Sequence, residues 1–430
     1  MESYRVFSAP SKAMVAGGYL VLDPQYRSFV TALSCRMHAK IQELELGSEK
    51  TSRICVSSPQ FGGCWKFLVD DTLAIQETTG SRNPFLEATI KAVYGYVRPL
   101  AASSFQITLF SDPGYHTQDD TTVKTSSNQQ RRFLYHEKPI EQVPKTGMGL
   151  SAGFVTVVTA SLLTALLNKP VTDIRDVIHK VAQIAHCDAQ GKIGSGFDVA
   201  TAVYGSIVYR RFKPEVINHL LGREVNEEYS SALKQVVDMD WDFTSSPCTL
   251  PPGIKLLMGD VKSGSETPKL VSKVLAWRKE DVESACVYKQ LDDANESFMR
   301  ELDALCSLYK SDPTKYLSLA DVHKYEPLKN AIVAIRRGLQ ALTVKSGAEV
   351  EPQEQSRLLD NCSKLPGCLG GVVPGAGGYD AICIFVLEKD LQLLREASAS
   401  NPEFREVTWL DLTEESEGLI EEDAKEYEGL

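Results

Sequence analysis

The residues with the clearest chemical potential form a short glycine-rich run that leads directly into a long apolar segment. In this run, VPKTGMGLSA, Gly147 and Gly149 allow the backbone to approach a ligand closely and to adopt positive φ. A helix predicted to begin at Leu150 or Ser151 would direct unpaired N–H groups and the positive end of its dipole at an anion. The Ser151 hydroxyl and the Lys145 ammonium would add to such a site. The run is typical of a phosphate-binding loop, although on its own it fits an ordinary turn before a buried helix equally well.

Two charged side chains elsewhere in the chain have the types that a phosphate site would need. Lys12 follows a predicted turn and has apolar neighbours. Such a lysine is usually a surface residue, and the alternative is a side chain directed into a cleft. Asp198 lies between Phe197 and Val199 at the start of a short predicted helix, after a turn with three glycines. It could simply cap that helix, or it could face the same cleft as the glycine-rich run, where a metal-bound phosphate would favour a carboxylate.

Two further loops have a similar composition. The segment KSGSET at 262–267 precedes a predicted helix with Ser265 as its expected N-cap, and Gly375, Gly377 and Gly378 form a predicted tight turn before a strand. Three glycine loops, a lysine and an apolar-flanked aspartate are typical of phosphoryl transfer, which depends on positioning and charge neutralisation. The sequence motifs of P-loop, protein-kinase and Rossmann proteins are absent, so we expect a different nucleotide-binding fold.

The elements that must position these residues follow from hydrophobic periodicity. Strands are predicted at residues 4–9, 29–39, 39–46, 54–58, 64–69, 105–110, 131–137, 206–212, 254–261, 370–373, 381–387 and 407–410. Helices are predicted at residues 83–97, 151–168, 172–191, 267–278, 281–309, 325–345, 352–364 and 391–399. The polar segment 111–130 is predicted to be a mobile surface loop. Together these elements predict an α+β fold.

Length and charge distribution predict the domain organisation. A polar, irregular link follows residue 213 and separates two domains, each large enough for its own core. We expect an N-terminal domain over residues 1–225 and a C-terminal domain over 226–412. Nine acidic residues and one lysine lie between Asp411 and Glu428. We therefore expect 413–430 to be an acidic tail that is solvated and partly disordered.

Composition argues against several classes of protein. A formal charge of -11 argues against a nucleic-acid partner, which would need a basic face. Ten cysteines without a CxxC pair or a His-Cys ligand spacing predict reduced thiols. The first residues lack the basic region and long apolar core of a signal peptide, and no apolar run approaches the roughly 20 residues of a membrane span. We expect a cytoplasmic protein that does not bind membranes.

Several motifs of this chain resemble those of a known family. PKTGMGLSAG resembles the central motif of the GHMP kinases, PxxxGLGSSA, while FSAPSKAMVAGGYLVLD and VPGAGGYDAICIF resemble their first and third motifs. Within that family, AHCDAQGKIGSGFDVATAVYGSIVYRRF and MGDVKSGSETPKLV resemble the fungal-type phosphomevalonate kinases, and the resemblance spans about residues 5–412. It implies a two-domain α+β fold, with an N-terminal ATP-binding domain like domain 2 of a small-subunit ribosomal protein and a ferredoxin-like C-terminal domain.

The resemblance also implies a set of site residues. The phosphates of ATP would be held by Lys145, Gly147, Met148, Gly149, Leu150, Ser151, Ala152, Gly375, Ala376 and Gly377. Lys12 and Asp198 would be catalytic, and Ser151 would also bind Mg²⁺. The substrate would contact Tyr19, Lys192, Ser195, Ser263, Gly264 and Ser265. This chain departs from the family at Ser11 and Leu150, where Gly and Ser are usual, and the leucine removes one hydroxyl. His186 and Gln190 are candidates for a second metal ligand by position only.

The charge of the acceptor and the cations near the motifs favour a phosphate monoester as the substrate. A phosphate monoester has a second pKa of about 6, so it is a charged nucleophile at neutral pH and needs no base. Cations lie in or beside the motifs at Lys12, Lys145, Lys192, Arg210, Arg211, Lys262 and Lys269. Together with the resemblance, this chemistry leads us to expect ATP-dependent phosphorylation of 5-phosphomevalonate to the 5-diphosphate, in isoprenoid and sterol synthesis, by a monomer or homodimer. The alternatives are mevalonate kinase, diphosphomevalonate decarboxylase or a non-catalytic ATP-binding sensor.

Overall fold

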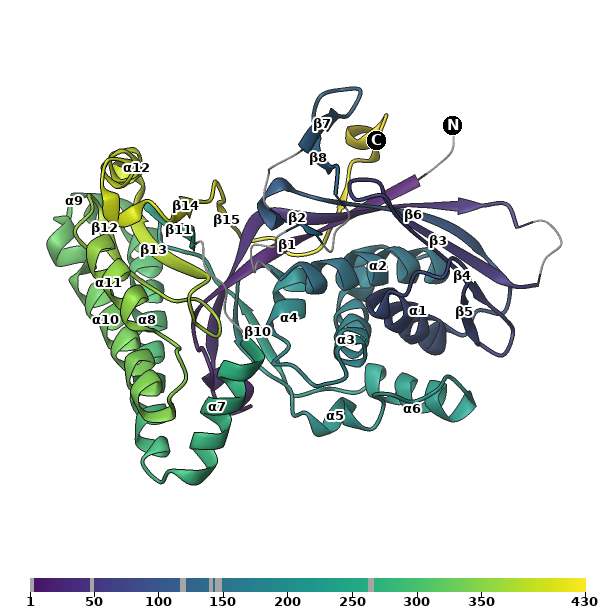
Figure 1. The fold of residues 1–430 in the computed structure, drawn as a ribbon, viewed down its shortest axis with the longest axis horizontal. Coiled ribbons are helices and arrows are strands. Elements are labelled where there is room, and N and C mark those ends of the chain that lie inside the picture. The colour runs from purple at the N-terminus through teal and green to yellow at the C-terminus, as the bar shows by residue number, and fades with distance from the viewer. Residues whose placement is uncertain (1–3, 47–49, 117–120, 139–141, 144–148, 262–266) are drawn as a thin grey trace.

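The computed structural model describes residues 4–46, 50–116, 121–138, 142–143, 149–261 and 267–430, and it divides the chain into two domains (Figure 1). The N-terminal domain is a large twisted sheet with helices against one face. The C-terminal domain stacks long helices on a smaller sheet. The long strands β1 (Tyr4–Ala16) and β2 (Ser28–Leu44) extend from the first domain towards the second.

Within the described residues, the N-terminal sheet contains ten strands, most of them antiparallel. Besides β1 and β2 they are β3 (Ser52–Ser58), β4 (Gly63–Val69), β5 (Ile75–Glu77), β6 (Ser104–Ser111), β9 (Ile207–Arg210), β10 (Thr244–Pro247), β15 (Glu414–Glu415) and β16 (Ile420–Glu422). The main path runs β10-β9-β2-β6-β3-β4-β5, and β1 pairs with β2 and β16. The helices of this domain are α1 (Pro84–Val97), α2 (Leu150–Leu167), α3 (Val171–Gln190), α4 (Phe197–Tyr204), α5 (Glu215–Asn218) and α6 (Glu227–Asp238).

The C-terminal domain is built on a smaller antiparallel sheet. Its strands are β11 (Ile254–Val261), β12 (Cys368–Val372), β13 (Ala381–Leu387) and β14 (Val407–Trp409), in the order β12-β13-β11-β14. Its helices are α7 (Thr267–Glu280), α8 (Ser284–Ser311), α9 (Pro313–Ser318), α10 (Asp321–Ser346), α11 (Gln353–Cys362) and α12 (Leu391–Ala399). The two-domain α+β fold expected from the sequence is confirmed.

Helix α2 is the central helix of the N-terminal domain and confirms the prediction for the segment after the glycine-rich run. It follows Gly149, which has φ 81°, and ends at Asn168, which has φ 50°. By length and composition α2 could cross a membrane, but 67% of its apolar window is buried against α1, α3 and the strands β1 and β2. Its many β-branched residues therefore pack into the core, and its N-terminus is held in place by that packing.

The structure corrects the expectation for the segment that carries Lys12. We expected a strand over 4–9 followed by a turn, but β1 continues to Ala16 with a register shift between Pro10 and Ser11. Proline cannot donate a ladder hydrogen bond, and a bulge accommodates it within the strand. Lys12 therefore lies on a strand that pairs with β2, opposite Ala32, rather than on an exposed turn.

Two other expectations for irregular segments are wrong. The segment 111–130 contains β7 (Thr121–Thr125), which forms a hairpin with β8 (Arg132–His136), so β8 does not rejoin the main sheet. The supposed link after residue 213 contains α5, α6 and β10. Helix α6 packs on α1, and β10 pairs with β9, so the N-terminal domain extends to Pro247 rather than 225.

The expectation of a solvated acidic tail is also wrong. Strand β15 pairs with β2, and β16 pairs with β1, so the tail completes the N-terminal sheet. Tyr427 is fully buried, and its hydroxyl lies 2.8 Å from His38 Nδ1. Glu415 pairs with the buried Arg36, and Glu422 and Glu426 pair with Arg131. The acidic composition of the tail did not predict this packing, because its acidic residues form ion pairs with basic residues that lie far away in the sequence.

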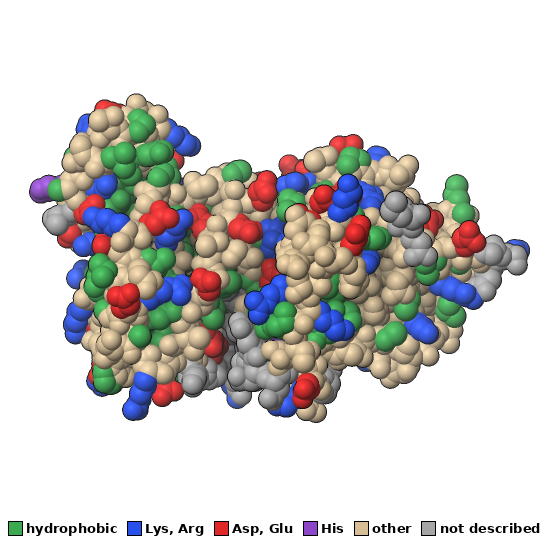
Figure 2. Space-filling view, turned by 90° about the horizontal axis from the view of Figure 1, so that it is seen from above, with side chains coloured by type: hydrophobic (Ala, Val, Ile, Leu, Met, Phe, Trp, Pro, Cys, Tyr) green, Lys and Arg blue, Asp and Glu red, His purple; other side chains and the backbone are tan. Residues whose placement is uncertain are grey.

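Charged side chains of both signs are interspersed over the face of the molecule in Figure 2. Blue and red side chains neighbour one another on both domains in this view. Surface ion pairs of the molecule include Arg98 with Glu227 and Lys345 with Glu283. On this face the excess of acidic residues is therefore mixed with basic residues.

Candidate active site

The start of α2 lies against the side chain of Lys12. Gly149 has a positive φ of 81°, and a Cβ added there would lie 2.9 Å from Lys12 Cε. Glycine is therefore favoured both by backbone conformation and by this close approach. Lys12 Nζ also lies 5.4 Å from the centre of the Phe197 ring at the start of α4. Burial lowers the pKa of Lys12, and the negative charge of Asp198 opposes that shift.

Polar side chains from three helices lie close to His186 on α3. Ser151 Oγ on α2 lies 3.0 Å from His186 Nε2, and the amide nitrogen of Gln190 lies 3.1 Å from the same atom. Asp198 Oδ2 on α4 is 3.9 Å away. A neutral imidazole with its proton on Nδ1 has one lone pair on Nε2, which can accept a hydrogen bond from the Ser151 hydroxyl or from the Gln190 amide. Three helices thus bring a hydroxyl and a carboxylate to one imidazole.

Asp198 has two separate environments for its two carboxylate oxygens. Its Oδ1 accepts a hydrogen bond of 3.0 Å from the Val199 N–H, near the start of α4. Its Oδ2 faces His186, and its side chain is 24% exposed. Asp198 is therefore the second residue of α4 rather than its N-cap, which is Gly196, and its other oxygen faces the group around His186. Its role in a phosphate site stays a prediction.

The third glycine loop connects the two domains. The Gly375 N–H donates to the Met14 carbonyl at 3.0 Å, and the Tyr19 hydroxyl donates to the Ala376 carbonyl at 2.6 Å. Gly377 has φ 73°, and a Cβ there would lie 2.1 Å from a carbonyl oxygen in the connection between α10 and α11. Glycine is required at this position, and the loop holds the C-terminal domain against β1.

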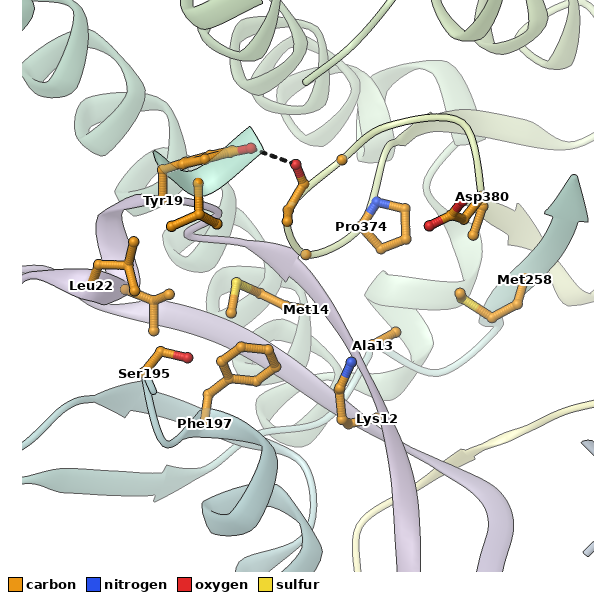
Figure 3. Close-up of a pocket in the computed structure, with 16 residues that line it drawn as sticks. Lys12, Ala13, Met14, Tyr19, Leu22, Ser195, Phe197, Met258, Pro374 and Asp380 are labelled. Atoms are coloured by element: carbon orange, nitrogen blue, oxygen red, sulfur yellow. Dashed lines mark hydrogen bonds between the residues drawn. The ribbon is translucent and has the colours of Figure 1, made fainter. Parts of the chain in front are cut away.

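A cavity of about 280 Å³ lies between the domains, and Figure 3 shows its lining. We refer to it as the interdomain cavity. Lys12, Ser195 and Phe197 line it from the N-terminal domain, and Met258 and Asp380 line it from the C-terminal domain. Its apolar walls and few polar groups suit a small molecule with a hydrocarbon skeleton and charged ends.

A second cavity of about 420 Å³ opens beside the first turns of α2. We refer to it as the α2 cavity. Leu150 and Phe154 of α2 line it together with Trp65, Asn83 and Gln60. Aromatic walls and amide side chains suit a flat heteroaromatic ring that also forms hydrogen bonds. Sequence reasoning missed this cavity because its residues come from several segments, and apart from the start of α2 none of these belongs to a recognised motif.

Most of the described site residues expected from the sequence lie around these two cavities or His186. They are Lys12, Tyr19, Gly149, Leu150, Ser151, Ser195, Asp198, Gly375, Ala376 and Gly377. Ala152 is buried, and its N–H donates to the Gly149 carbonyl at 3.2 Å in the first turn of α2. The expected site residues Lys145, Gly147, Met148, Ser263, Gly264 and Ser265 lie outside the described residues, as does Lys262.

Three expected cations are placed elsewhere. Lys192 is exposed and lines neither cavity, because the chain turns towards solvent after Gly191, the residue that ends α3. Arg210 pairs with Asp242. Arg211 donates to the carbonyls of Leu22 and Gly194, so it braces the turn that carries Ser195. The cations that are neighbours in sequence therefore do not form one binding group, and Lys192 is not placed to contact a substrate in either cavity.

Among the residues that the structure describes, no group of three or more His, Cys, Asp or Glu side chains is positioned to hold an ion. Ser151 and Asp198 do offer two oxygen donors beside the same imidazole nitrogen. Mg²⁺ in kinases is commonly held by one or two protein oxygens together with substrate phosphates and water. This donor set fits a Mg²⁺ ion that binds with a polyphosphate.

Known sequences similar to this chain are kinases. The family model for the GHMP kinases N terminal domain matches residues 127–206. The phosphomevalonate kinase of Candida albicans is 52% identical over 432 residues, which cover 99% of this chain and 100% of that protein. The phosphomevalonate kinase of Aspergillus fumigatus is 33% identical, with 88% of this chain and 86% of that protein covered.

Solved structures share the fold at low sequence identity. Phosphomevalonate kinase of Streptococcus pneumoniae, in complex with phosphomevalonate and AMPPNP, has a TM-score of 0.63 at 17% identity and covers 95% of this chain and 99% of its own. Mevalonate kinase of L. major, in complex with R-mevalonate, has a TM-score of 0.54 at 14% identity, with 96% of each chain covered. At these low sequence identities, the comparisons with solved structures show that the fold is shared and nothing more.

Proposed function

Since this chain belongs to the GHMP kinase family, in which its full-length relatives are phosphomevalonate kinases, we propose that it transfers the γ-phosphate of ATP to (R)-5-phosphomevalonate. The products are 5-diphosphomevalonate and ADP. The reaction joins two phosphates, so the enzyme must hold two polyanions together and neutralise their charge. In the cell this activity would serve the mevalonate pathway to isoprenoids and sterols.

One structural observation supports the proposal most directly. Lys12, Ser151 and Asp198 are far apart in the sequence, but β1, α2 and α4 bring them to one place. Lys12 contacts Gly149 at the start of α2, and its pKa responds to the charge of Asp198. Ser151 and Asp198 share the imidazole of His186. A cation, a carboxylate and a helix N-terminus at one point form a site that can align two phosphates.

The two cavities suggest where each substrate binds. Leu150 and Phe154 line the α2 cavity, whereas Lys12 lines the interdomain cavity and contacts the residue that precedes α2. The N-terminus of α2 therefore lies between the cavities. We assign the base of ATP to the α2 cavity, its phosphates to the N-terminus of α2 and the acceptor to the interdomain cavity. In this arrangement the γ-phosphate faces the acceptor.

Lys12 would neutralise the charge that accumulates during transfer. Its side chain is half-buried, and burial lowers the pKa of its ammonium, while the carboxylate of Asp198 favours the charged form. Bound phosphates would favour the charged form further. Lys12 Cε lies so close to Gly149 that a Cβ there would be 2.9 Å away, so the ammonium is positioned beside the N-terminus of α2, where we expect the phosphoryl group to pass.

Asp198 would orient groups rather than remove a proton. The acceptor phosphate is already ionised at neutral pH, so no general base is needed for its attack. An alcohol acceptor such as mevalonate would need one. The negative charge of Asp198 acts on the Lys12 ammonium, and its Oδ2 beside His186 can supply an oxygen ligand.

ATP is expected to bind with Mg²⁺, held by the Ser151 hydroxyl and the Asp198 carboxylate. When bound, the ion would neutralise charge on the β- and γ-phosphates. Leu150 stands where the family usually has serine, and here it lines the α2 cavity. Its side chain can therefore pack against the nucleoside, and the backbone donors at the start of α2 are unaffected by the substitution.

A coupled ADP-release assay tests the proposed function. Purified protein with ATP and Mg²⁺ is supplied separately with mevalonate, 5-phosphomevalonate and 5-diphosphomevalonate. We expect ADP formation with 5-phosphomevalonate and diphosphate product by ³¹P NMR. Turnover of mevalonate alone would identify a mevalonate kinase instead. Binding of ATP without ADP formation in the presence of any of the three would favour a sensor.

A further inference from the structure

Helix α7 forms part of the wall that the C-terminal domain contributes to the interdomain cavity. Leu270, Val274 and Trp277 are buried on one stripe of α7, and the helix packs against α8 and α10 of its own domain. Val271 and Arg278 are half-buried and lie seven residues apart, so they share the neighbouring stripe. Val271 lines the cavity. The placement of this second stripe therefore shapes one wall of the cavity.

An ion pair joins α7 to a wall of the same cavity that the N-terminal domain provides. Val21 and Leu22 line the cavity from that domain (Figure 3), and Asp23 follows them directly. Arg278 Nη2 donates to Asp23 Oδ2 at 2.5 Å, and the two side chains are 27% and 22% exposed. The Leu22 carbonyl also accepts a hydrogen bond of 2.9 Å from the buried Arg211. The ion pair therefore connects α7 to a segment that is braced within its own domain.

Aromatic side chains hold the Arg278 guanidinium in place. Its Cζ lies 4.2 Å from the centre of the Tyr288 ring on α8. Tyr288 is buried, and its ring centre lies 6.5 Å from that of Trp277 and 6.3 Å from that of Tyr26 in the N-terminal domain. A planar guanidinium that stacks on an aromatic ring loses little further freedom when it forms an ion pair. Arg278 is therefore preorganised to meet Asp23, unlike the long side chains of a typical exposed ion pair.

Hydrogen bonds within its own turn fix the carboxylate of Asp23. Its Oδ1 accepts from the Gln25 backbone N–H at 3.1 Å, and its Oδ2 accepts from the Gln25 side-chain amide at 3.0 Å. Burial raises the pKa of Asp23, but hydrogen bonds from Arg278 and Gln25 outweigh this effect and bring the pKa below its ordinary value. The carboxylate is therefore charged at neutral pH and forms an ion pair with Arg278.

We propose that Arg278 is a positioning residue for the acceptor, because its ion pair with Asp23 holds α7 at the distance from Val21 and Leu22 that the acceptor needs. This inference rests on the proposed function, which assigns the acceptor to the interdomain cavity. An acceptor that contacts both walls binds only those molecules in which the walls are correctly spaced. Loss of the ion pair lowers the fraction of such molecules and weakens acceptor binding in proportion.

The ATP site provides an internal control for this inference. All described residues that line the α2 cavity lie between Met37 and Phe154, so they belong to the N-terminal domain. Neither α7 nor the segment that carries Asp23 contributes to that lining. Loss of the ion pair should therefore change the affinity for the acceptor and leave the affinity for ATP as it is.

Replacement of Asp23 by asparagine tests the inference. Asp23→Asn can keep the oxygen that accepts from the Gln25 N–H, while the oxygen that faces Arg278 becomes an NH₂ group. We expect KM for 5-phosphomevalonate to rise about tenfold, as when one charge-assisted hydrogen bond is lost. KM for ATP, and kcat at saturating acceptor, should stay within about threefold of the wild-type values. A general structural defect would instead lower kcat and raise both KM values, and that outcome would contradict the inference.

A double variant and a matched control show whether the pair itself is responsible. Arg278→Met removes the charge, keeps an unbranched side chain over Tyr288 and should raise KM for the acceptor by a similar factor. Adding Asp23→Asn to it should change that KM by no more than about twofold, because both changes remove the same interaction. Glu296→Gln weakens the ion pair of Glu296 with Arg27, which also joins the domains but whose members line neither cavity. It should leave KM for the acceptor within about twofold of wild type.

Two kinetic outcomes would overturn the assignment. If Glu296→Gln raises KM for the acceptor as much as Asp23→Asn does, docking of the domains in general is responsible rather than Arg278. If the effects of Asp23→Asn and Arg278→Met multiply in the double variant, the two side chains act independently of each other.

Hydrogen exchange distinguishes failure of this inference from failure of the proposed function, because it needs no substrate. We expect backbone amides of α7 to exchange faster in Asp23→Asn and Arg278→Met than in the wild-type protein, with unchanged exchange in α2. If the wild-type protein forms no ADP with 5-phosphomevalonate, the proposed function fails, and the exchange data still decide whether the pair positions α7. Unchanged exchange of α7 in both variants, or an unchanged KM for the acceptor in an active enzyme, would overturn the role of Arg278 alone.

Discussion

Ser151 Oγ and His186 Nε2 lie 3.0 Å apart, so a hydrogen bond joins the hydroxyl at the start of α2 to helix α3. The amide of Gln190 lies 3.1 Å from the same nitrogen. With the ring proton on Nδ1, His186 Nε2 can accept the proton of the Ser151 hydroxyl, and the Ser151 oxygen then presents its lone pairs to a cation. His186 is thus a positioning residue for the oxygen that we assign to Mg²⁺.

Replacement of His186 tests this relationship. We expect His186→Ala to lower kcat about 10- to 100-fold and to raise the Mg²⁺ concentration that gives half-maximal activity, because the Ser151 hydroxyl loses its orientation. His186→Gln places an acceptor oxygen in the same region and should recover part of the activity. Steady-state kinetics at varied Mg²⁺ provide the measurement. A fall in kcat with an unchanged Mg²⁺ dependence would instead indicate general structural damage.

Lys12 should be required for turnover. We expect Lys12→Ala to lower kcat by about 10²-fold or more, because one preorganised charge at the transferring phosphate is removed. Lys12→Met keeps the length of the side chain and its contact with Gly149, so it isolates the effect of charge. Both variants should bind ATP in a fluorescence titration. Near-normal turnover in Lys12→Met would show that this charge does not act in the reaction.

Asp198 should affect chemistry more than stability. Its side chain is partly exposed and faces His186 with one oxygen, so Asp198→Ala removes a charge without opening a large cavity. We expect kcat to fall about 10²-fold or more, with thermal unfolding close to that of the wild-type protein. Because Asp198 is not assigned as a base, the pH dependence of residual activity in Asp198→Asn should keep the wild-type shape. Loss of the acidic limb in that variant would identify Asp198 as a base after all.

Gly149 should tolerate no side chain. A methyl group there would lie 2.9 Å from Lys12 Cε, at a backbone φ of 81° that disfavours other residues. We expect Gly149→Ala to lower kcat at least about tenfold through displacement of Lys12 and to lower stability by about 1–2 kcal/mol. Gly191→Ala has a comparable φ of 64° with open space around it and is the matched control. It should show the loss of stability without the loss of turnover.

A buried histidine should make the protein sensitive to acid. His179 on α3 is fully buried beside Tyr204 and Phe243, and both of its ring nitrogens lack a hydrogen-bond partner within the described structure. Burial lowers the pKa of His179 to about 3. Between pH 6.5 and that value the unfolded state binds more protons than the folded state, so stability must fall as the pH is lowered.

We therefore expect about 2 kcal/mol of apparent unfolding free energy to be lost through His179 between pH 7.5 and 5. His179→Phe should remove this loss, and at pH 7.5 it should be at least as stable as wild type because two unpaired polar atoms disappear. Urea unfolding of both proteins at the two pH values measures the difference. Parallel pH profiles would contradict the burial of an uncharged imidazole.

The sequence predicted those features that depend on local chemistry. The apolar run after Gly149 predicted helix α2 and its start next to a glycine. Lys12 and Asp198 were singled out by their neighbours and by motif. The bulge at Pro10 was not foreseen, because proline followed by serine equally fits a turn, and only pairing of β1 with β2 keeps the strand intact.

Other features depend on contacts between residues that are far apart in the sequence, so local sequence patterns could not predict them. The α2 cavity assembles residues from separate loops. Asp380 lies inside a motif that was noted for its glycines, and only the fold shows that it lines the same cavity as Lys12. The tail was expected to be solvated because of its charge. Leu419 and Tyr427, both fully buried, were the apolar signals that could have indicated packing.

The position of β16 beside β1 has a consequence for biosynthesis. Strand β1 is translated long before β16, so it lacks one of its partners until residue 422 has been translated, and His38 lacks its contact with Tyr427 until that residue follows. During the intervening elongation the nascent N-terminal domain has an open strand edge, which is a template for unwanted association. We expect this edge to need cotranslational chaperones until β16 pairs with it.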